Sequence, residues 1–376
     1  MAINAKNILF LSSWYPNAHQ PFVGNFIRRQ AELLATQHVV TVVHTVASDE
    51  EAKMRLETTS EGNLTEHIVY HPRGKNGFRK LRLQKKALLK ALKEIRNIDI
   101  IYTSILLPKA LQFIAAKKRF NCPWIHLEQG SYFRPQVWKE WPKSQKLMAR
   151  KAGKHIDELF VGSAFLKKDM DEIFPSHSIG IVPNHVDTDV FICANQKNKS
   201  TTTFLHISTL DPNTKDPKGM IDACAILKKK IGSSFSFQII SDGESEMWKE
   251  YVQSLGLTDT VLFDGHKEWK DLPKFYQSAD AFVLNSVYET FSIVLAESWA
   301  TGTPTITTPV GIGYDIPPHL GMQTKIGNPQ QLAETMEEFI QQKENYDSLE
   351  IRKRALQYSA KNVLQRFNEI ISDHVK

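Results

Sequence analysis

Short apolar runs rich in β-branched residues alternate along the chain with longer stretches of helical periodicity. In the first half, six such runs predict strands, at Ile8–Leu11, Val39–His44, Ile98–Tyr102, Trp124–His126, Glu158–Val161 and Ile179–Val182. Helical spacing occurs at Asn25–Ala35 and Arg82–Ile95, with one apolar face formed by Leu81, Leu88, Leu92 and Ile95. This alternation predicts a doubly wound, mostly parallel sheet.

The same rhythm restarts in the second half. Five runs predict strands, at Phe204–Ser208, Ser236–Ile240, Val261–Phe263, Ala281–Leu284 and Thr303–Thr307. Helical stretches join them, at Gly219–Lys230, Glu246–Leu255, Leu272–Gln277 and Ile293–Ala300. A polar segment at Pro183–Ser200 separates the halves. We therefore expect α/β domains at residues 1–185 and 186–355, and a C-terminal helix at 356–376 that packs back on the first domain.

Composition narrows the class of protein. A chain of 376 residues with 41% apolar and 23% charged residues can bury a core in each half. Only three cysteines occur, without a Cys-x-x-Cys pair, which argues against a disulfide framework or a zinc site and favours a reducing compartment. No apolar run approaches the ~20 residues of a membrane helix. The expected location is cytoplasmic, either free or peripheral on the inner face of the cytoplasmic membrane.

The net charge of +6 is unevenly distributed. The stretch Arg73–Arg96 holds ten lysines and arginines and one acid, Glu94. It is either a solvated helix face or a contact surface for an anionic membrane or a pyrophosphate-linked acceptor. Nucleic acid is not an expected partner, because no interleaved aromatic residues and no nucleic-acid-binding motif accompany the charge.

The clearest chemical signal is the segment Tyr288–Glu297, which follows a predicted strand and a short polar turn. A helix beginning near Phe291 would direct free backbone N–H groups outward, where they bind phosphate well. If the segment were helical throughout, Glu289 and Glu297 would lie roughly 12 Å apart along the helix axis. Spacing alone favours the simpler interpretation of two ordinary helix glutamates.

This segment resembles the Glu-x7-Glu motif of the family 4 glycosyltransferases. Other segments resemble the same family in order and spacing: Ser12–Pro16, Gly24–Phe26, Val182–Asp187, Phe204–Gly219, Ile239–Gly243, Val261–Gly265, Ala300–Pro304, Val310–Gly311 and Gly327–Pro329. The resemblance covers nearly the whole chain. It implies the GT-B fold, in which two Rossmann-like parallel-sheet domains face a cleft, and retaining transfer from a UDP- or GDP-linked sugar.

The resemblance also implies roles for individual residues. The resemblance implies catalytic roles for Glu289, Lys215 and Lys218. It implies donor binding by Glu297, Phe291, Ser292, Ile293, Gly243, Gly265, His266 and Gly24. It places Glu128 and Gln129 on the acceptor side. The sequence departs from the family pattern at two positions. Thr209 replaces the arginine expected beside the phosphate-binding lysine, which leaves the choice between Lys215 and Lys218 open. Gln129 occupies a position where the family often has histidine, and it cannot transfer a proton.

Neither a metal ion nor another cofactor is expected. Asp187-Thr188-Asp189 imitates the Asp-x-Asp metal motif of the other glycosyltransferase fold, but it directly follows the interdomain segment. His126 is expected to be a core histidine. The nicotinamide fingerprint Gly-x-Gly-x-x-Gly is absent.

The expected function is glycosyl transfer from a nucleotide sugar to a glycan or a lipid-linked acceptor, in the synthesis of surface polysaccharide or glycoconjugate. Two alternatives remain open at this point. One is a sugar-nucleotide epimerase of similar fold, and the other is a non-catalytic glycan- or lipid-binding module.

Overall fold

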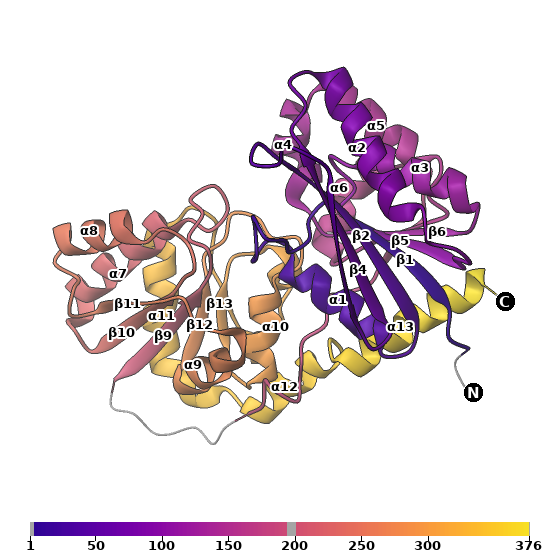
Figure 1. Ribbon diagram of the computed structural model, residues 1–376. Helices are drawn as coiled ribbons and strands as arrows, with labels where there is room; N and C mark the ends of the chain where they lie inside the picture. The colour runs from indigo at the N-terminus through magenta and orange to yellow at the C-terminus, as the bar shows by residue number, and fades with distance from the viewer. Residues whose placement is uncertain (1–3, 194–200, 376) are drawn as a thin grey trace. The chain divides into compact units, whose positions relative to one another are not determined.

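The computed structural model describes residues 4–193 and 201–375, so the last part of the predicted polar segment at 183–200 lies outside the described residues. The chain forms two compact units (Figure 1). Unit 1 comprises residues 1–184 and 363–376, and unit 2 comprises 185–362. In the described part of the chain, no helix is long and apolar enough to cross a membrane.

Unit 1 is built on an eight-stranded sheet with the order β3-β4-β2-β1-β5-β6-β7-β8. Its strands are β1 Asn7–Ser12, β2 Val39–Ser48, β3 Arg55–Glu61, β4 Leu64–Pro72, β5 Ile100–Ser104, β6 Trp124–Glu128, β7 Glu158–Val161 and β8 Ile179–Ile181. Its helices include α1 Asn25–Ala35, α2 Gly77–Leu92, α3 Ala110–Phe120, α4 Pro135–Glu140, α5 Lys143–Gly153 and α6 Ala164–Ile173. All neighbouring strands are parallel except β3 and β4.

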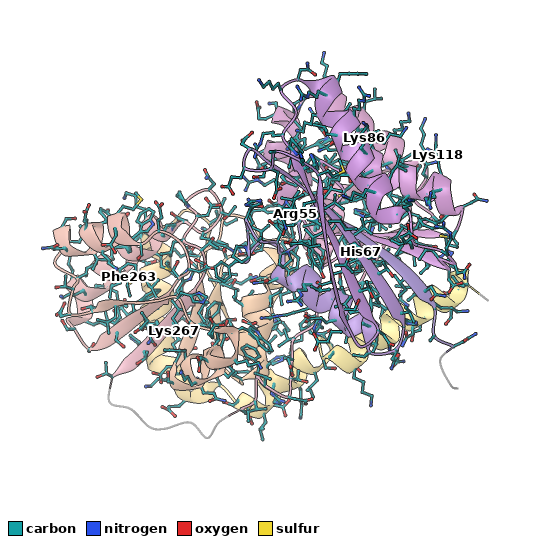
Figure 2. All side chains as sticks on the ribbon, viewed as in Figure 1. Arg55, His67, Lys86, Lys118, Phe263 and Lys267 are labelled. Carbon is teal, nitrogen blue, oxygen red and sulfur yellow. The ribbon has the colours of Figure 1, made fainter. Side chains whose placement is uncertain are left out.

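The hairpin of β3 and β4, on which Figure 2 labels Arg55 and His67, was not predicted. The sequence of β3 is almost entirely polar and its side chains are largely exposed, so it lacks the apolar run that marks a buried strand. Cross-strand pairing with β4 decides its structure instead. The turn needs Gly62, whose φ of +55° is one that side-chain-bearing residues rarely adopt.

The helix predicted at Arg82–Ile95 begins earlier, at Gly77, where the side chain of Asn76 accepts a hydrogen bond from the backbone N–H of Arg79. Leu88, Leu92 and Ile95 are buried in the core of unit 1, as their spacing predicts. Leu81 was wrongly placed on that buried face, since it is 43% exposed on the first turns of α2. The basic stretch therefore belongs to a helix that covers the sheet.

The C-terminal helix α13, Ala360–His374, belongs to unit 1 from Val363 onward. Its Phe367 ring contacts Tyr102 edge-on at 5.6 Å, and Asn368 Oδ1 lies 2.8 Å from His38 Nε2. Phe367 is almost fully buried, so apolar burial attaches this segment to the first sheet.

Unit 2 contains a fully parallel six-stranded sheet with the order β11-β10-β9-β12-β13-β14. Its strands are β9 Thr202–Ile207, β10 Phe235–Ile240, β11 Val261–Gly265, β12 Ala281–Leu284, β13 Thr305–Thr307 and β14 Gly321–Gln323. Its helices are α7 Pro217–Ile231, α8 Glu246–Ser254, α9 Leu272–Ser278, α10 Ile293–Ala300, α11 Pro329–Gln342 and α12 Ser348–Leu356. The short strand β14 was not predicted. The prediction of two Rossmann-like parallel sheets is confirmed.

Strand order reverses at one point in each sheet: between β1 and β5 in unit 1, and between β9 and β12 in unit 2. In open α/β sheets, ligands bind beyond the carboxyl ends of the strands at such a switch point. The loops that follow these four strands are therefore the places to look for function.

Candidate functional site

The switch point of unit 2 brings together two of the predicted catalytic residues. Lys215 lies in the loop after β9, and Glu289 lies in the loop after β12. The Lys215 ammonium forms an ion pair with Glu289 Oε1, and Ser286 Oγ donates to the same oxygen at 2.7 Å. The side chains of Lys215 and Glu289 are 19% and 12% exposed, so water reaches the pair without surrounding it.

Hydrogen bonds hold the two loops beside each other. The backbone N–H of Val287 donates to the carbonyl of Thr214 at 2.7 Å. Asn285 Nδ2 donates to Asp216 Oδ2 at 3.0 Å, while Asp216 Oδ1 accepts from the N–H of Gly219 and so caps α7. Asp216 adopts a left-handed φ of +43°, which turns the chain sharply into α7. These contacts position Lys215 and Glu289 on a rigid scaffold.

The predicted glycine at position 243 has a steric reason to be glycine. A Cβ atom at Gly243 would lie 1.9 Å from the carbonyl oxygen of Thr209, which is far inside contact distance. The loop after β10 thus packs directly on the backbone of the loop after β9. Thr209, which replaces the expected arginine, contributes its carbonyl to this contact.

Helix α10 begins at Ile293, with Ser292 as its N-cap at a left-handed φ of +78°. The helix predicted at Ile293–Ala300 is confirmed. Glu289 precedes it in an irregular loop, so the spacing of a continuous helix does not apply to Glu289 and Glu297. The hydroxyl of Ser292 is buried and has no hydrogen-bond partner among the described residues. An unused hydroxyl beside the open N–H groups of a helix N-terminus offers several donors to an anion.

The loop after β13 supports this end of α10. The N–H of Ile312 donates to the carbonyl of Phe291 at 2.8 Å. Gly311 lies so close that a Cβ atom there would be 2.4 Å from the same carbonyl. The Phe291 ring is buried against Tyr358, with ring centroids 5.3 Å apart, so Phe291 contributes its backbone to the site and its side chain to the core.

Glu297 lies on α10, and its carboxylate points toward two aromatic side chains. Tyr276 donates its hydroxyl to Glu297 Oε2 at 3.0 Å, and Trp269 Nε1 donates to Oε1 at 3.3 Å. Glu297 is only 4% exposed. Nothing in the sequence marked Trp269 as part of this group, because it lies in a short connecting segment and reaches Glu297 only through the fold.

A buried histidine, His206, lies at the end of β9 beneath the Lys215 loop. His206 Nδ1 is 2.8 Å from the carbonyl of Val283, which can only accept, so Nδ1 carries the proton and Nε2 accepts from Ser208 Oγ at 2.7 Å. Burial, assisted by the charge of Lys215, lowers the pKa of His206 to about 4. The imidazole is therefore neutral at pH 7 and adds no charge to the site.

Three other predicted residues lie apart from this cluster. Lys218 is 62% exposed on α7, where it pairs with Asp222 at 2.7 Å and lies over the ring of Tyr251. This geometry favours Lys215 over Lys218 as the cation of the site. Gly265, at a φ of +64°, ends β11 and His266 follows it; β11, on which Figure 2 labels Phe263, is two strands away from β9.

Two family models match this chain, and together they span most of it. The model described as "Glycosyltransferase Family 4" matches residues 23–190. The model described as "Glycosyl transferases group 1" matches residues 187–358. The chain belongs to glycosyltransferase family 4. The second model covers every residue of unit 2 described above, from Lys215 to Glu297.

Relatives of this glycosyltransferase differ widely in their named reactions. It is 27% identical over 273 residues to a Campylobacter jejuni α-1,4-N-acetyl-D-galactosaminyltransferase named for a diNAcBac-PP-undecaprenol substrate, covering 71% of this chain and 70% of that protein. It is 52% identical over 60 residues to the mannosylfructose-phosphate synthase of Agrobacterium fabrum, an alignment that spans only 13% of the synthase.

Solved structures share the fold over the full length of the glycosyltransferase. The sucrose-phosphate synthase of Thermosynechococcus elongatus superposes with a TM-score of 0.78 at 15% identity, covering 98% of both chains. The Anabaena protein HepE, crystallised in complex with UDP, superposes with a TM-score of 0.74 at 15% identity, covering 98% of this chain and all of HepE. The prediction of the GT-B fold is confirmed.

In unit 1 of the glycosyltransferase, Glu128 is fully buried at the end of β6. Its two oxygens accept hydrogen bonds from the backbone N–H groups of Leu106, Gln129 and Gly130, and Oε2 lies 3.2 Å from His126 Nε2. A carboxylate has about four lone-pair sites, and all are engaged. The prediction that Glu128 binds an acceptor is therefore wrong, because its side chain holds loops together instead.

Gln129 is also turned inward. Its Oε1 accepts from Ser104 Oγ at 2.8 Å, and its Nε2 donates to Asn184 Oδ1. At 4% exposure it can meet an acceptor only through a rearrangement of these contacts. His126 is a core histidine as predicted, with Nδ1 2.7 Å from Thr103 Oγ1.

Gly24 precedes α1 at a φ of +80°, and a Cβ atom there would lie 3.0 Å from the backbone of Trp14. The turn after β1 therefore requires glycine for backbone reasons.

In the Asp-x-Asp segment, Asp187 Oδ1 accepts from the N–H groups of Asp189 and Val190, at 3.0 and 3.2 Å. This carboxylate already forms a local turn, which accounts for its presence without a metal ion.

Proposed function

We propose that this protein is a retaining glycosyltransferase that moves a sugar from a nucleoside diphosphate to a hydroxyl of a glycan or a lipid-linked acceptor. The observation that carries the proposal is the switch point of unit 2. There the Lys215–Glu289 pair and the unpartnered Ser292 hydroxyl lie in the loops after β9 and β12, at the start of α10. Cation, hydroxyl and helix amides together suit a diphosphate.

Each group has a role in the proposed reaction. Negative charge grows on the leaving diphosphate as the glycosidic bond breaks, and Lys215 with the first amides of α10 stabilises that charge. Glu289, whose charge Lys215 balances before the donor binds, holds hydroxyls of the donor sugar and steadies positive charge at the anomeric carbon. Glu297, oriented by Tyr276 and Trp269, accepts hydrogen bonds from the ribose hydroxyls.

The family membership supports retention of stereochemistry, and we propose a front-face route for it. Among the described residues of unit 1, the one buried carboxylate is Glu128, which is saturated with hydrogen bonds and cannot act as a nucleophile. The leaving phosphate would instead accept the proton of the attacking acceptor hydroxyl. The bond to the acceptor oxygen then forms on the face from which the diphosphate departs.

Relatives support a UDP-linked donor. HepE was crystallised with UDP-glucose as well as with UDP, and the trehalose-6-phosphate enzyme of E. coli was crystallised with UDP-2-fluoro glucose. The Campylobacter relative is named for a polyprenyl-diphosphate substrate, which supports a lipid-linked acceptor. A thermal-shift screen of nucleoside diphosphates and nucleotide sugars tests the proposal. UDP or GDP should raise the melting temperature, since a ligand that binds only the folded state stabilises it. No shift with any nucleoside diphosphate at millimolar concentration would overturn the assignment.

We also propose that the reaction needs no metal ion, because Lys215 and the α10 amides can neutralise the diphosphate. Transfer activity should then persist in EDTA. Loss of activity on chelation and its recovery with Mn²⁺ would refute this part of the proposal and return attention to Asp187 and Asp189.

The outer face of α2 is the proposed contact with an anionic membrane. Within the described residues, Lys80, Arg82, Lys85 and Lys86 have no ion-pair partner, and all are exposed on α2, where Figure 2 labels Lys86. Phe78, on the same helix, is 80% exposed. Each lysine or arginine near an anionic surface contributes about 1 kcal/mol to binding.

A vesicle sedimentation assay tests this contact. Wild-type protein should bind vesicles that contain anionic lipid, and binding should fade as salt rises. Changing Lys80, Arg82, Lys85 and Lys86 to Gln should abolish sedimentation while nucleotide binding is unchanged. The variant Phe78→Ser removes the exposed apolar side chain, and so separates the contribution of apolar insertion to vesicle binding from that of electrostatic attraction alone. Equal sedimentation of the wild type and the four-fold variant would reject the membrane role and favour a soluble acceptor.

A further inference from the structure

The switch point of unit 1 contains a buried ammonium group that the proposed chemistry does not use. Lys109 follows β5 and immediately precedes α3. Its side chain is turned toward β2, where Nζ donates to the carbonyl of Thr45 at 2.7 Å and lies 3.2 Å from His44 Nδ1 and 3.3 Å from Nε2. Lys109 is only 9% exposed.

The hydrogen bonds around Lys109 supply no negative charge. His44 Nδ1 lies 3.0 Å from the carbonyl of Ser12, which can only accept, so Nδ1 carries the proton and Nε2 is the ring nitrogen left to accept from Lys109. In the described ranges 4–193 and 201–375, no carboxylate pairs with Lys109. The titratable groups that face it are His44 on β2 and His71 on β4. Burying an ammonium without a counter-charge is costly, so an anionic partner would be strongly favoured.

A second unused donor lies beside it. Gln112, in the first turn of α3, accepts from Thr45 Oγ1 at 3.0 Å through Oε1. Its Nε2 atom is buried and has no hydrogen-bond partner among the described residues. Lys109 and Gln112 thus contact the same residue of β2, and both belong to the start of α3, where the helix dipole also favours negative charge.

The backbone of this loop is strained. Ile105, the first residue after β5, has a φ of +54°, which is unusual for a β-branched side chain. Its carbonyl is fixed by the N–H of Ser13 at 3.3 Å, and the N–H of Leu106 is fixed by Glu128. Strain of this kind collects at ligand-binding sites, where the surrounding structure imposes it.

We infer that Lys109, Gln112 and the start of α3 form a subsite for an oxyanion, a phosphate or carboxylate group carried by the acceptor. The site offers a cation and an amide donor, while the Thr45 carbonyl and the His44 ring are engaged by Lys109 and Gln112 Oε1 is engaged by Thr45. The subsite would therefore select acceptors with an acidic group. This inference rests on the proposed transfer reaction only in that the anion is assigned to an acceptor. The binding of the anion itself does not depend on that reaction.

Burial lowers the pKa of Lys109 to about 7, whereas the pKa values of His44 and His71 lie below their ordinary value, so both imidazoles are neutral near pH 7. The protonated amine binds an anion and the neutral amine does not. Anion affinity should therefore be full below pH 7 and fall about tenfold per pH unit above it.

Sulfate is a suitable probe because its own charge is constant from pH 6 to pH 9. Its dissociation constant should be measured by calorimetry in the Lys215→Met background, which removes the cation of the donor site. We expect the tenfold loss per pH unit above 7 and uptake of one proton at pH 8. Lys109→Met should abolish the pH dependence of sulfate affinity and the proton uptake, whereas Lys109→Arg should bind sulfate without the pH dependence. Lys118→Met, an exposed lysine on the same helix (Figure 2), should behave as the parent.

Two results would overturn the inference: sulfate affinity that is independent of pH between 6 and 9, or equal affinity in Lys109→Met. If Lys109→Met does not fold, the pH dependence of the parent and its absence in Lys109→Arg still decide. A hexose phosphate and a hexuronic acid as competitors then distinguish phosphate from carboxylate acceptors, and competition by neither would reject an acceptor subsite. Nucleoside diphosphate binding to the wild type, measured separately, tests the donor proposal alone.

Discussion

Replacing Lys215 by methionine removes the only cation that contacts Glu289 in the described structure while keeping most of the volume of the side chain. Two effects should weaken nucleoside diphosphate binding. The diphosphate loses a charge-assisted hydrogen bond, which contributes about 1.5–3 kcal/mol. The Glu289 carboxylate, which keeps its hydrogen bond from Ser286, then repels the diphosphate. A loss of about 10- to 100-fold in affinity follows.

The assay is calorimetric titration of UDP and GDP into wild type and variants at constant salt. Lys218→Met is the matched control, because that lysine is 62% exposed and pairs with Asp222 one helical turn away. Surface pairs of this kind contribute little, so its affinity should stay within about threefold of wild type. The double variant Lys215→Met/Glu289→Gln should recover part of the lost affinity, since it removes the repulsion.

Either of two results would refute this reasoning. Unchanged affinity in Lys215→Met would show that the diphosphate does not use this cation. An equal loss in Lys218→Met would show that both lysines, or neither, serve the site. Urea unfolding of each variant checks that the affinities belong to folded protein.

Three further predictions concern unit 2. Glu297→Ala should weaken nucleotide binding more than it lowers kcat, because ribose contacts are alike in the ground and transition states; a kcat loss with unchanged KM would contradict this. His206 has a pKa of about 4 in the folded state against 6.5 unfolded, so it stabilises the fold above pH 6.5 and that stability is lost as pH falls toward 4. This difference corresponds to about 3 kcal/mol, which urea unfolding of His206→Gln between pH 7 and pH 4.5 should show as a shallower decline. Gly243→Ala should destabilise the protein by about 1–3 kcal/mol because its Cβ would overlap the Thr209 carbonyl, whereas Gly77→Ala, with open space around it, should not; equal midpoints would contradict the steric argument.

The order of elements could be read from the sequence because it rests on local patterns. Apolar runs of strand length alternate with helical periodicity, and this alternation leaves a parallel sheet as the arrangement that buries both. The start and end of Asn25–Ala35 were predicted to the residue. Motif spacing also placed Glu289 and Glu297 near a helix N-terminus.

Other features depend on contacts between distant segments, which no local pattern encodes. Strand β3 exists because β4 pairs with it, although its own sequence is polar. The choice between Lys215 and Lys218 needed the ion pair with Glu289, a residue 74 positions away. Only the fold could show that Glu128 is saturated by three backbone N–H groups, and that Trp269 and Tyr276 orient Glu297.

The sequence by itself thus determined the two-sheet architecture and the neighbourhood of the proposed donor site, because hydrophobic periodicity and motif spacing are properties of short segments. The tertiary structure decided which charged groups meet, which are buried and which hydrogen bonds are already made. Those facts depend on desolvation and on contacts across the sheet switch points, and so the unpaired Lys109 became visible only once β2, β5 and α3 were in place.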